Sequence, residues 1–575
     1  MPVNNPPLLQ VDDLNVEFPS ADGRITAVNG VSFQINPGEI VALVGESGSG
    51  KSVTALSIMQ LLKRGGGAIT EGNITLYSGR EPLTITAASD HVMTLIRGKE
   101  IGMIFQEPMS ALNPAMTCGR QITEVVYKHL NLSANESFDR CINLLEEVGI
   151  PDPVEALLKY PHQFSGGQKQ RILLAMALAG NPRLLIADEP TTALDASVKR
   201  KINQLIHDVK AKHDLSVLYI SHDIESLKGF ADRILVMYAG KLIEEGKTDQ
   251  ILNNPKHPYT RGLLACRPPK SGHYYFLPTT DDFMRISLDG KDVQQTGSID
   301  EVFRKLEVSE GTRNANLKKM YASEPILKVC SISKSFVKAD SKTNKQFAVE
   351  NVSFNLFEGE TLGLVGASGS GKTTLGRCIV GLSQAEGGEA LIRSKSSDTF
   401  EPVPNLREVG SRIQYVFQDP YSSLNPILTI GKILREPLEN NKELSTKQRT
   451  EIIHEMLQTV GLEPFHATRY PGEFSGGQRQ RIAIARALLM NPEIIICDEV
   501  VSALDVSVQA KVLNLLNELK YENKLSYLFI SHDLDVVRHM CDRVLVMNEG
   551  RIVEEALSDQ LFEKPKTEYT KELLA

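Results

Sequence analysis

The chain has few of the features that mark secreted, disulfide-linked or membrane-spanning proteins. Its 575 residues include seven cysteines, and no two of them form a C-x-x-C pair. This spacing argues against both a disulfide framework and a zinc site. No stretch approaches the 18 consecutive apolar residues of a membrane-spanning helix. The first five residues hold neither a basic region nor an apolar run, so we expect no signal peptide and a cytosolic location.

The chain also lacks an excess of positive charge. Its formal net charge is −8 and its isoelectric point is near 5.9. Nucleic-acid-binding domains usually carry a strongly basic surface, so the composition gives no support for a nucleic-acid partner. The length is too great for one hydrophobic core and indicates several domains.

What the chain does contain is a set of short motifs that occurs twice in the same order. Residues 45–52 and 366–373 both fit the pattern G-x-x-x-x-G-K-[ST]. Each lies between an apolar, strand-like run (40–44 and 362–365) and a helix with apolar periodicity, which is the context that a phosphate-binding loop requires. The two lysines lie 321 residues apart and the later motifs 310 to 312 apart, so the second half is collinear with the first after small deletions. We interpret the chain as a duplicated nucleotide-triphosphate-using protein.

The repeat predicts a first domain at 1–266, a linker at 267–323 and a second domain at 324–575. The linker opens with two prolines and holds nine Lys or Arg against eight Asp or Glu. Apolar residues at helical spacing predict one short amphipathic helix within it: Ile299, Val302, Phe303 and Leu306. We expect the rest to be flexible linker.

Within each half, apolar strand-like runs alternate with helical patterns. Residues 184–187 and 218–220, and their counterparts 494–497 and 528–530, are continuously apolar, as in strands covered on both faces. Alternating strands and helices indicate an α/β fold with a mostly parallel sheet.

The glycine-rich loops predict two ATP sites with magnesium. Backbone N–H groups and a helix N-terminus surround the phosphates in such a loop, and glycines let the backbone approach them. The side chains of Lys51 and Lys372 supply positive charge, and the hydroxyls of Ser52 and Thr373 can ligate Mg²⁺. The further loop residues that we assign to ATP binding are Gly45, Ser47, Gly48, Gly50, Gly366, Ser368, Gly369 and Gly371.

Polar residues at the ends of the apolar runs predict the metal site. Gln106 and Gln418 each follow a strand and can contact both the metal ion and the attacking water. Asp188 and Asp498 end buried strands. Because a buried carboxylate is costly unless it binds a positive charge, we expect both to lie at the magnesium ion, and we call them the metal-side acids.

The predicted catalytic residues come directly after these strands. Glu189 and Glu499 are placed to polarise a water for in-line attack, a role worth about 10²–10⁴ in rate. His222 and His532 lie in Ser-His-Asp sequences 310 residues apart, and we expect each to contact the γ-phosphate.

Each half holds a second candidate anion site at the start of a helix. The sequence Ser-Gly-Gly-Gln combines a favoured N-cap residue with glycines that expose N–H groups at the positive helix end. These residues are Ser165, Gly166, Gly167 and Gln168 in the first half and Ser475, Gly476, Gly477 and Gln478 in the second. Two phosphate-binding edges in one domain suggest a head-to-tail pair in which both halves hold each nucleotide.

Taken together, these motifs and the Leu-Asp loops at Asp195 and Asp505 resemble those of ATP-binding-cassette ATPases. The resemblance covers nearly the whole chain outside the linker. Finer features are similar to oligopeptide/dipeptide permease ATPases of the fused two-cassette type. They lie at residues 45–52, 105–114, 160–168, 257–264, 417–426 and 568–574.

The resemblance implies two tandem P-loop cassettes, each with a mostly parallel core sheet, an antiparallel β subdomain and a helical subdomain. It implies that Lys51 shares one ATP with the Ser-Gly-Gly of the second half, and Lys372 the other ATP with that of the first. Phe18 and Phe336 occupy the position where an aromatic ring stacks on adenine, although core packing is an alternative role.

The resemblance also implies partners and a location. It implies an importer for peptides or peptide-like solutes, with one copy of this chain on two integral-membrane permease subunits and a solute-binding protein. The chain would then lie peripherally on the cytoplasmic face of the inner membrane, without a nucleic-acid partner. Some family members carry a cysteine cluster after the His-Pro-Tyr-Thr tail. Only Cys266 lies nearby here, so we expect no iron–sulfur centre.

The two halves differ after the catalytic acid. Val500 and Val501 stand where the first half has Pro190 and Thr191, so the second acid lacks a φ-restricting neighbour. Because Glu499 is retained, we predict that both sites hydrolyse ATP, the second more slowly.

Two other classes of cassette protein are alternatives. A two-cassette, ribosome-associated translation factor also lacks membrane spans, but typically joins its cassettes by a long charged helical arm, whereas this linker is close to neutral and interrupted by Pro and Gly. A DNA-repair cassette protein would require zinc-binding cysteines.

Overall fold

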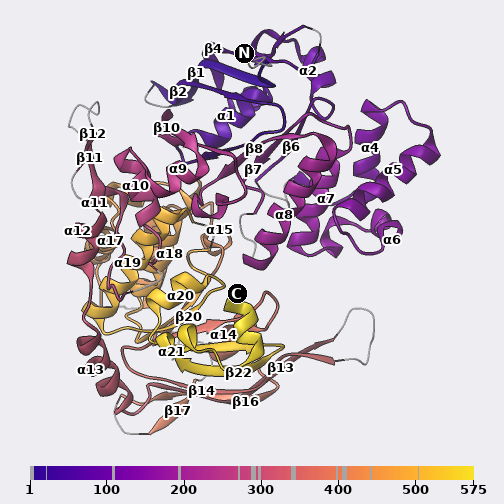
Figure 1. The fold of residues 1–575 in the computed structure, drawn as a ribbon. Coiled ribbons are helices and arrows are strands. Elements are labelled where there is room, and N and C mark those ends of the chain that lie inside the picture. Colours follow the sequence, from indigo (N-terminus) through magenta and orange to yellow (C-terminus); the bar gives the residue numbers. More distant parts are fainter. Residues whose placement is uncertain are drawn as a thin grey trace. The chain divides into compact units, whose positions relative to one another are not determined.

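The computed structural model divides the chain into two compact units (Figure 1). The first comprises residues 1–264 with 283–296, and the second comprises 265–282 with 297–575. The residues described are 6–20, 23–79, 81–106, 111–191, 196–269, 272–286, 293–295, 299–337, 345–395, 399–403, 411–440, 443–502 and 504–574.

A six-stranded sheet forms the centre of the first unit, with strand order β10-β9-β3-β8-β7-β6. Its strands are β3 (Ile40–Val44), β6 (Ile101–Ile104), β7 (Leu184–Asp188), β8 (Ser216–Ser221), β9 (Arg233–Tyr238) and β10 (Lys241–Lys247). All pair in parallel except β10, which is antiparallel to β9. Every residue of β3, β7 and β8 is buried, which confirms the interpretation of their continuous apolar runs.

A four-stranded antiparallel sheet, in the order β2-β1-β4-β5, packs beside the central sheet. It consists of β1 (Leu9–Ser20), β2 (Gly23–Ile35), β4 (Ala68–Leu76) and β5 (Leu83–Thr84). One apolar cluster joins this sheet to the helix α1 (Lys51–Ile58) and to one face of the central sheet. The second cluster of the unit lies on the other face, among helices. The helices of the unit besides α1 are α2 (Asp90–Ile96), α4 (Cys118–His129), α5 (Ala134–Glu147), α6 (Pro153–Leu158), α7 (Gly166–Leu178), α8 (Ala196–His213), α9 (Thr248–Asn253) and α10 (Pro258–Ala265).

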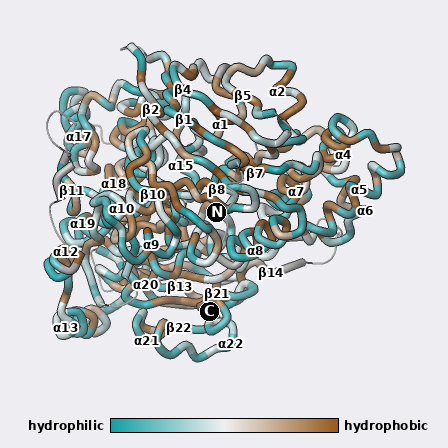
Figure 2. Tube along the Cα trace, turned by 45° about the horizontal axis from the view of Figure 1, so that its top comes forward, coloured by the Kyte–Doolittle hydropathy of each residue, from teal (hydrophilic) through white to brown (hydrophobic). Residues whose placement is uncertain are grey.

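The second unit repeats this architecture. Its six-stranded sheet has the same connectivity, in the order β18-β19-β20-β15-β21-β22, and its antiparallel sheet has the order β14-β13-β16-β17. The strands are β13 (Leu327–Val337), β14 (Lys345–Leu356), β15 (Thr361–Val365), β16 (Gly387–Arg393), β17 (Phe400–Pro402), β18 (Ile413–Val416), β19 (Ile494–Asp498), β20 (Ser526–Ile530), β21 (Arg543–Asn548) and β22 (Arg551–Leu557). The helices are α14 (Lys372–Ile379), α15 (Pro420–Ser423), α16 (Ile430–Arg435), α17 (Thr446–Thr459), α18 (Gly476–Leu488), α19 (Val506–Asn523), α20 (Leu534–Met540), α21 (Ser558–Glu563) and α22 (Glu568–Leu574). Figure 2 shows hydrophobic, brown stretches within the strands of both units.

The segment between the cassettes is partly ordered. It contains α11 (Thr280–Phe283), β11 (Met284–Ile286), β12 (Val293–Gln295), α12 (Ile299–Leu306) and α13 (Glu310–Tyr321). The helix α12 confirms the short amphipathic helix expected there. The boundaries 1–266, 267–323 and 324–575 remain predictions.

Residues 274–282, which we call the strap, lie along α19 of the second unit instead of forming free linker. The Asn514 side chain donates to the carbonyl of Leu277 (2.8 Å) and accepts from its N–H (2.7 Å). Asn517 donates to the carbonyl of Tyr275 (2.6 Å), and Lys511 forms an ion pair with Asp281 (2.7 Å). The helix α13 is held to the same unit by a hydrogen bond from Tyr321 to Glu360. These segments are ordered because their polar backbone groups find side-chain partners on the second unit.

Candidate functional site

The two phosphate-binding loops connect a buried strand to a helix, as the sequence predicts. In the first unit, β3 leads into α1, which begins at Lys51 after the left-handed Gly50. The backbone of Gly45 has φ +154°, and a Cβ there would lie 2.2 Å from the carbonyl oxygen of Met237, so only glycine fits. The second unit places β15, α14 and Gly371 in the same way.

Both loop lysines fold back onto their own loops. Lys51 Nζ donates to the carbonyl oxygens of Gly45 (2.8 Å) and Glu46 (2.9 Å). Lys372 Nζ makes the equivalent bonds to Gly366 and Ala367, at 2.8 and 2.9 Å. The loops are therefore shaped around a single ammonium group that can be redirected to a phosphate by side-chain rotation.

The predicted metal-side residues meet in pairs. The hydroxyl of Ser52 donates to Asp188 Oδ1, and that of Thr373 donates to Asp498 Oδ1, both at 3.0 Å. Burial raises the pKa of Asp188 to about 6, against the opposing effect of the Ser52 hydrogen bond. Burial also raises the pKa of Asp498. A hydroxyl beside a buried carboxylate is a donor set that suits a hard cation such as Mg²⁺, so the residues fit the ion.

The predicted catalytic acid of the first unit lies between the predicted glutamine and histidine. Gln106 Nε2 donates to Glu189 Oε2 at 3.0 Å, and His222 Nδ1 lies 3.4 Å from the same oxygen. Glu189 is buried and has φ +46°. Such a left-handed conformation is strained for a non-glycine residue and is held only where surrounding contacts enforce it.

The second unit reproduces this arrangement. Gln418 Nε2 donates to Glu499 Oε2 at 2.8 Å, and His532 Nδ1 lies 3.1 Å from it. The φ of Glu499 is +49°, although Val500 follows it in place of proline. The backbone hydrogen bond from Glu499 N–H to the carbonyl of Ile530 (2.9 Å) matches that from Glu189 to Ile220 (3.1 Å). The neighbouring strand therefore sets the position of the acid in both units.

The Ser-Gly-Gly-Gln sequences begin the helices α7 and α18. In each, the serine accepts from the backbone N–H of the glutamine, and the glutamine side chain accepts from the serine N–H, which forms a capping box. Ser165 and Ser475 are exposed. The pairing of each helix end with the phosphate loop of the other unit stays a prediction.

The remaining predicted residues are placed differently in the two units. Phe18 is half-buried against Gly67, whereas Phe336 is 53% exposed, so the ring of Phe336 has the freer surface for a base. Asp505 lies at the N-terminus of α19 and is buried. Asp195 lies outside the described residues.

Two tyrosines that our sequence reasoning did not assign to the site support the phosphate loops. The backbone N–H of Glu46 donates to the hydroxyl of Tyr259 (2.9 Å), and that of Ala367 donates to Tyr569 (3.0 Å). Tyr259 belongs to the His-Pro-Tyr-Thr tail and is completely buried. A signal was available, because the Tyr-Thr pairs of the two tails lie 310 residues apart, the same offset as the catalytic acids.

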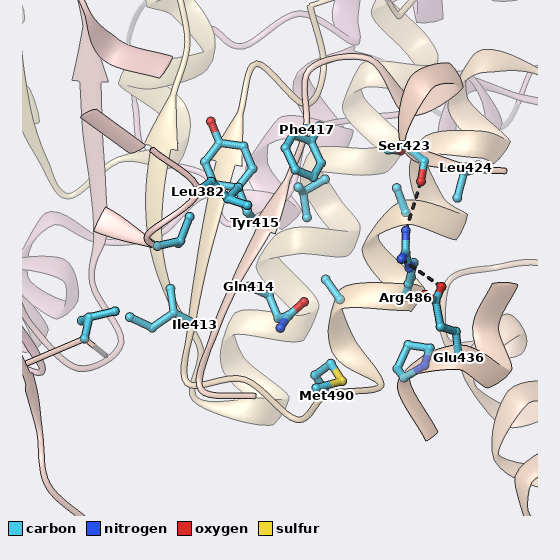
Figure 3. A pocket seen from close by; sticks show the side chains of 16 residues that line it. Leu382, Ile413, Gln414, Tyr415, Phe417, Ser423, Leu424, Glu436, Arg486 and Met490 are labelled. Carbon is cyan, nitrogen blue, oxygen red and sulfur yellow. Dashed lines mark hydrogen bonds and ion pairs between the residues drawn. The ribbon is translucent and has the colours of Figure 1, made fainter. Parts of the chain in front are cut away.

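A groove of about 370 Å³ lies beside the predicted Gln418 in the second unit (Figure 3). Apolar side chains from β18, from α18 and from the residues that follow them line it, including Tyr415, Phe417 and Met490. An ion pair between Arg486 and Glu436 (3.0 Å) lies at one side. The groove thus has an apolar floor and a charged margin, and its lining residue Phe417 directly precedes Gln418 in the chain.

Two domain families match the chain. The ABC transporter family matches residues 28–192 and 349–502. The family described as the C-terminal region of oligopeptide/dipeptide transporters matches residues 243–280, a stretch that includes Tyr259 and part of the strap.

Relatives match over nearly the full chain. The glutathione import ATP-binding proteins GsiA of Shigella sonnei (strain Ss046) and Escherichia coli (strain K12) are each 43% identical over 573 residues, which cover 99% of this chain and 89% of theirs. Among solved structures, a dimeric ATP-binding cassette in a post-hydrolysis state with ADP and Pi is 29% identical. That match covers 42% of this chain and 98% of the other, with a TM-score of 0.38. None of the described helices is long and apolar enough to cross a bilayer.

Proposed function

The chain belongs to the ATP-binding-cassette transporter family, and from that premise we propose that it drives an importer of peptides or peptide-like solutes. It is an ATPase with two cassettes in one chain. The observation that carries the proposal is the match of residues 243–280 to the C-terminal region of oligopeptide/dipeptide transporters. The relatives are named for import of glutathione, itself a small peptide. Nothing in these matches favours the ribosome-associated alternative.

The described contacts support separate roles for the phosphate loop and for the acid within each cassette. The loop N–H groups and the lysine bind the phosphates. Glu189 and Glu499 polarise the attacking water, and the glutamine and histidine beside each acid hold its carboxylate toward the phosphate. In both units one strand lies between the strand that ends at the acid and the strand that leads into the phosphate loop. The three parallel strands end at the same edge of the sheet, which brings the water and the γ-phosphate together there.

The hydroxyl–carboxylate pairs Ser52–Asp188 and Thr373–Asp498, with Gln106 and Gln418, are the residues that would hold Mg²⁺. When bound, the ion neutralises charge on the β- and γ-phosphates. Each hydroxyl keeps its proton and donates it in a hydrogen bond to the carboxylate, so the lone pairs of its oxygen would be available to the ion.

The two halves are proposed to combine head to tail. Each ATP is then held by one phosphate loop and by the Ser-Gly-Gly helix end of the other half, which places an anion against a positive helix terminus. Closure on ATP and opening after hydrolysis move the surfaces beside Gln106 and Gln418, which transmits the energy of hydrolysis as a domain movement.

The partners are proposed to be two membrane-spanning permease subunits, with a solute-binding protein and one copy of this chain per transporter. The groove beside Gln418 supports this assignment, because its apolar floor and charged margin suit an amphipathic segment of a permease subunit. The chain would then lie peripherally at the cytoplasmic face of the inner membrane.

The experiment that tests this function traps the ATP-bound state with Glu189→Gln plus Glu499→Gln and identifies the proteins that co-purify from detergent-solubilised cells. We expect two multi-spanning membrane proteins in stoichiometric yield with ATP and not with ADP. Ribosomal proteins without a membrane partner would contradict the importer. A variant with Lys51→Ala and Lys372→Ala added is the matched control, since it cannot hold the nucleotide and should lose the partners.

A further inference from the structure

The two metal-side acids are held differently. In the first unit, Asp188 accepts a hydrogen bond from Ser52 on Oδ1. In the second unit, Asp498 accepts from Thr373 on Oδ1 and also from the hydroxyl of Tyr415 on Oδ2, at 2.6 Å. Both carboxylate oxygens of Asp498 are therefore engaged, and a short bond to an ionised acceptor is among the stronger hydrogen bonds in proteins.

The position of Tyr415 corresponds to Met103 in the first unit. Met103 pairs with Ile186 across the sheet and Tyr415 pairs with Ile496, the same register in the two repeats. A methionine side chain has no proton to donate. The first unit therefore lacks the chemical group that makes this contact.

Two neighbours of Tyr415 differ between the repeats as well. Gly376 of α14 stands where α1 has Ala55, and a Cβ at 376 would lie 3.2 Å from Tyr415 Cε2 and 3.4 Å from its hydroxyl. Arg377 stands where α1 has Leu56, and it interacts with the tyrosine hydroxyl. Three positions thus change together, one supplying the donor, one making room for it and one adding a cation beside it.

The ring of Tyr415 also lines the groove described above (Figure 3). It lies 4.8 Å from the ring of Phe417, measured between centroids. One side chain therefore contacts the groove with its ring and the metal-side acid with its hydroxyl. The hydroxyl of a tyrosine is protonated at neutral pH, so Tyr415 can act as the donor in this hydrogen bond.

We propose that Tyr415 is a positioning residue of the second cassette, which fixes the carboxylate of Asp498 for metal binding and joins it to the groove. This inference rests on the proposed function, because it presumes that Asp498 serves a nucleotide-bound divalent cation. Met103, at the equivalent position of the first cassette, cannot make this connection, so the two sites bind the metal–nucleotide complex with unequal affinity, the second more tightly.

The test uses Mn²⁺ as the probe and the full-length chain. Lys51→Ala removes nucleotide from the first loop, so that Mn²⁺ binding in the presence of a non-hydrolysable ATP analogue reports the second site, measured by electron paramagnetic resonance. Adding Tyr415→Phe should weaken Mn²⁺ binding about tenfold, the effect of losing a hydrogen bond to a charged group. Nucleotide affinity in EDTA should stay unchanged, which separates positioning of the acid from a general loss of fold.

The matched control is the first cassette. In a Lys372→Ala background, Met103→Leu should leave Mn²⁺ affinity unchanged, because no donor is removed. Equal Mn²⁺ affinity with and without Tyr415→Phe would overturn the inference, as would parallel losses of Mn²⁺ and metal-free nucleotide binding, which indicate only a structural role. Absence of nucleotide-dependent Mn²⁺ binding in both parent backgrounds would instead overturn the proposed function, and the inference with it.

Discussion

The two cassettes share the arrangement around the catalytic acid and differ in what surrounds it. Glu189 and Glu499 have nearly the same backbone φ, the same backbone partner strand and the same glutamine and histidine neighbours. This agreement persists although Val500 replaces Pro190 beside the acid. A following proline is therefore not needed for this conformation, which in both units is accompanied by a backbone hydrogen bond from the acid to the adjacent strand.

The differences lie in the residues that contact the metal-side acid and the helix after the Leu-Asp loop. The strap covers α19 in the second unit, and Tyr415 reaches Asp498 there, whereas the first unit has Met103 and an exposed Gln204 at the equivalent positions. The comparison teaches that the duplicated chain retains the reacting groups in both copies and diverges in the residues that connect them to their surroundings.

We expect the largest difference in ATP affinity between the two sites when one loop lysine is replaced. Lys51→Ala or Lys372→Ala should weaken ATP binding at its own loop about 10- to 100-fold, because a charged donor to the phosphates is lost. Equilibrium titration with a fluorescent ATP analogue should show one site lost and one retained. Lys99→Ala, at an exposed position of the first unit, should bind as the parent does. Loss of both sites from one substitution would show that the loops do not bind independently.

Replacing the tail tyrosines, Tyr259 and Tyr569, should change ATP affinity less, and to a different extent at the two loops. Tyr259→Phe removes the hydroxyl that accepts from the N–H of Glu46 in a partly buried setting, and Tyr569→Phe removes the one that accepts from Ala367 in an exposed setting. We expect ATP affinity to fall about fivefold to tenfold at the first loop and less at the second. Tyr127→Phe, an exposed tyrosine, is the control. Equal affinities in all three variants would exclude a supporting role for the tail.

The helices α8 and α19, which follow the Leu-Asp loops, differ in their contacts: α19 binds the strap through Asn514, and α8 has Gln204 at that position. Asn514→Ala removes both hydrogen bonds to Leu277, about 1–2 kcal/mol of local stability, so amide exchange in residues 274–282 should accelerate about tenfold. Gln204→Ala on α8 removes only an exposed contact to Asp208 and should change exchange little. Unchanged protection of the strap in Asn514→Ala would show that other contacts hold it.

The smallest expected effect depends on pH and concerns His539 of the second unit, whose counterpart is Gly229. Burial lowers the pKa of His539 from 6.5 to about 4, and its Nε2 has no hydrogen-bond partner within the described residues. Because the unfolded chain takes up a proton near pH 6.5 and the folded chain only near pH 4, stability falls as the pH drops through this window. Between pH 7 and 5, His539→Gln should lose about 1–2 kcal/mol less stability than the parent, measured by urea unfolding followed by circular dichroism. The exposed His91→Gln should follow the parent, and identical curves for His539→Gln would refute the assignment.

Much of the fold and of the candidate site follows from local sequence. The phosphate loops, the strands that end in Asp-Glu and the helix starts at Ser165 and Ser475 are recognisable because each motif carries its own geometric requirement within about ten residues. Their repetition in the same order in both halves supports each assignment.

The contacts that could not be predicted join distant segments. Tyr259 meets a loop more than 200 residues earlier, and the strap finds Asn514 and Asn517 more than 230 residues later. From its sequence the strap is predicted to be linker, because it belongs to a nearly neutral stretch with prolines and its contact partners lie on a distant helix, α19. A tyrosine in an apolar strand indicates core packing, so the sequence does not identify Tyr415 as a site residue. Only the structure shows that its hydroxyl donates a hydrogen bond to Asp498.

The claim that most depends on this comparison is that one chain contains two ATP-hydrolysing centres. Steady-state phosphate release should be measured for the parent, Glu189→Gln, Glu499→Gln and the double variant, with Glu71→Gln, an exposed acid of β4, as the control. We predict that each single variant keeps measurable turnover and that the double variant falls at least 10²-fold below the parent. If Glu189→Gln alone abolished all turnover, independent hydrolysis at the second centre would be contradicted.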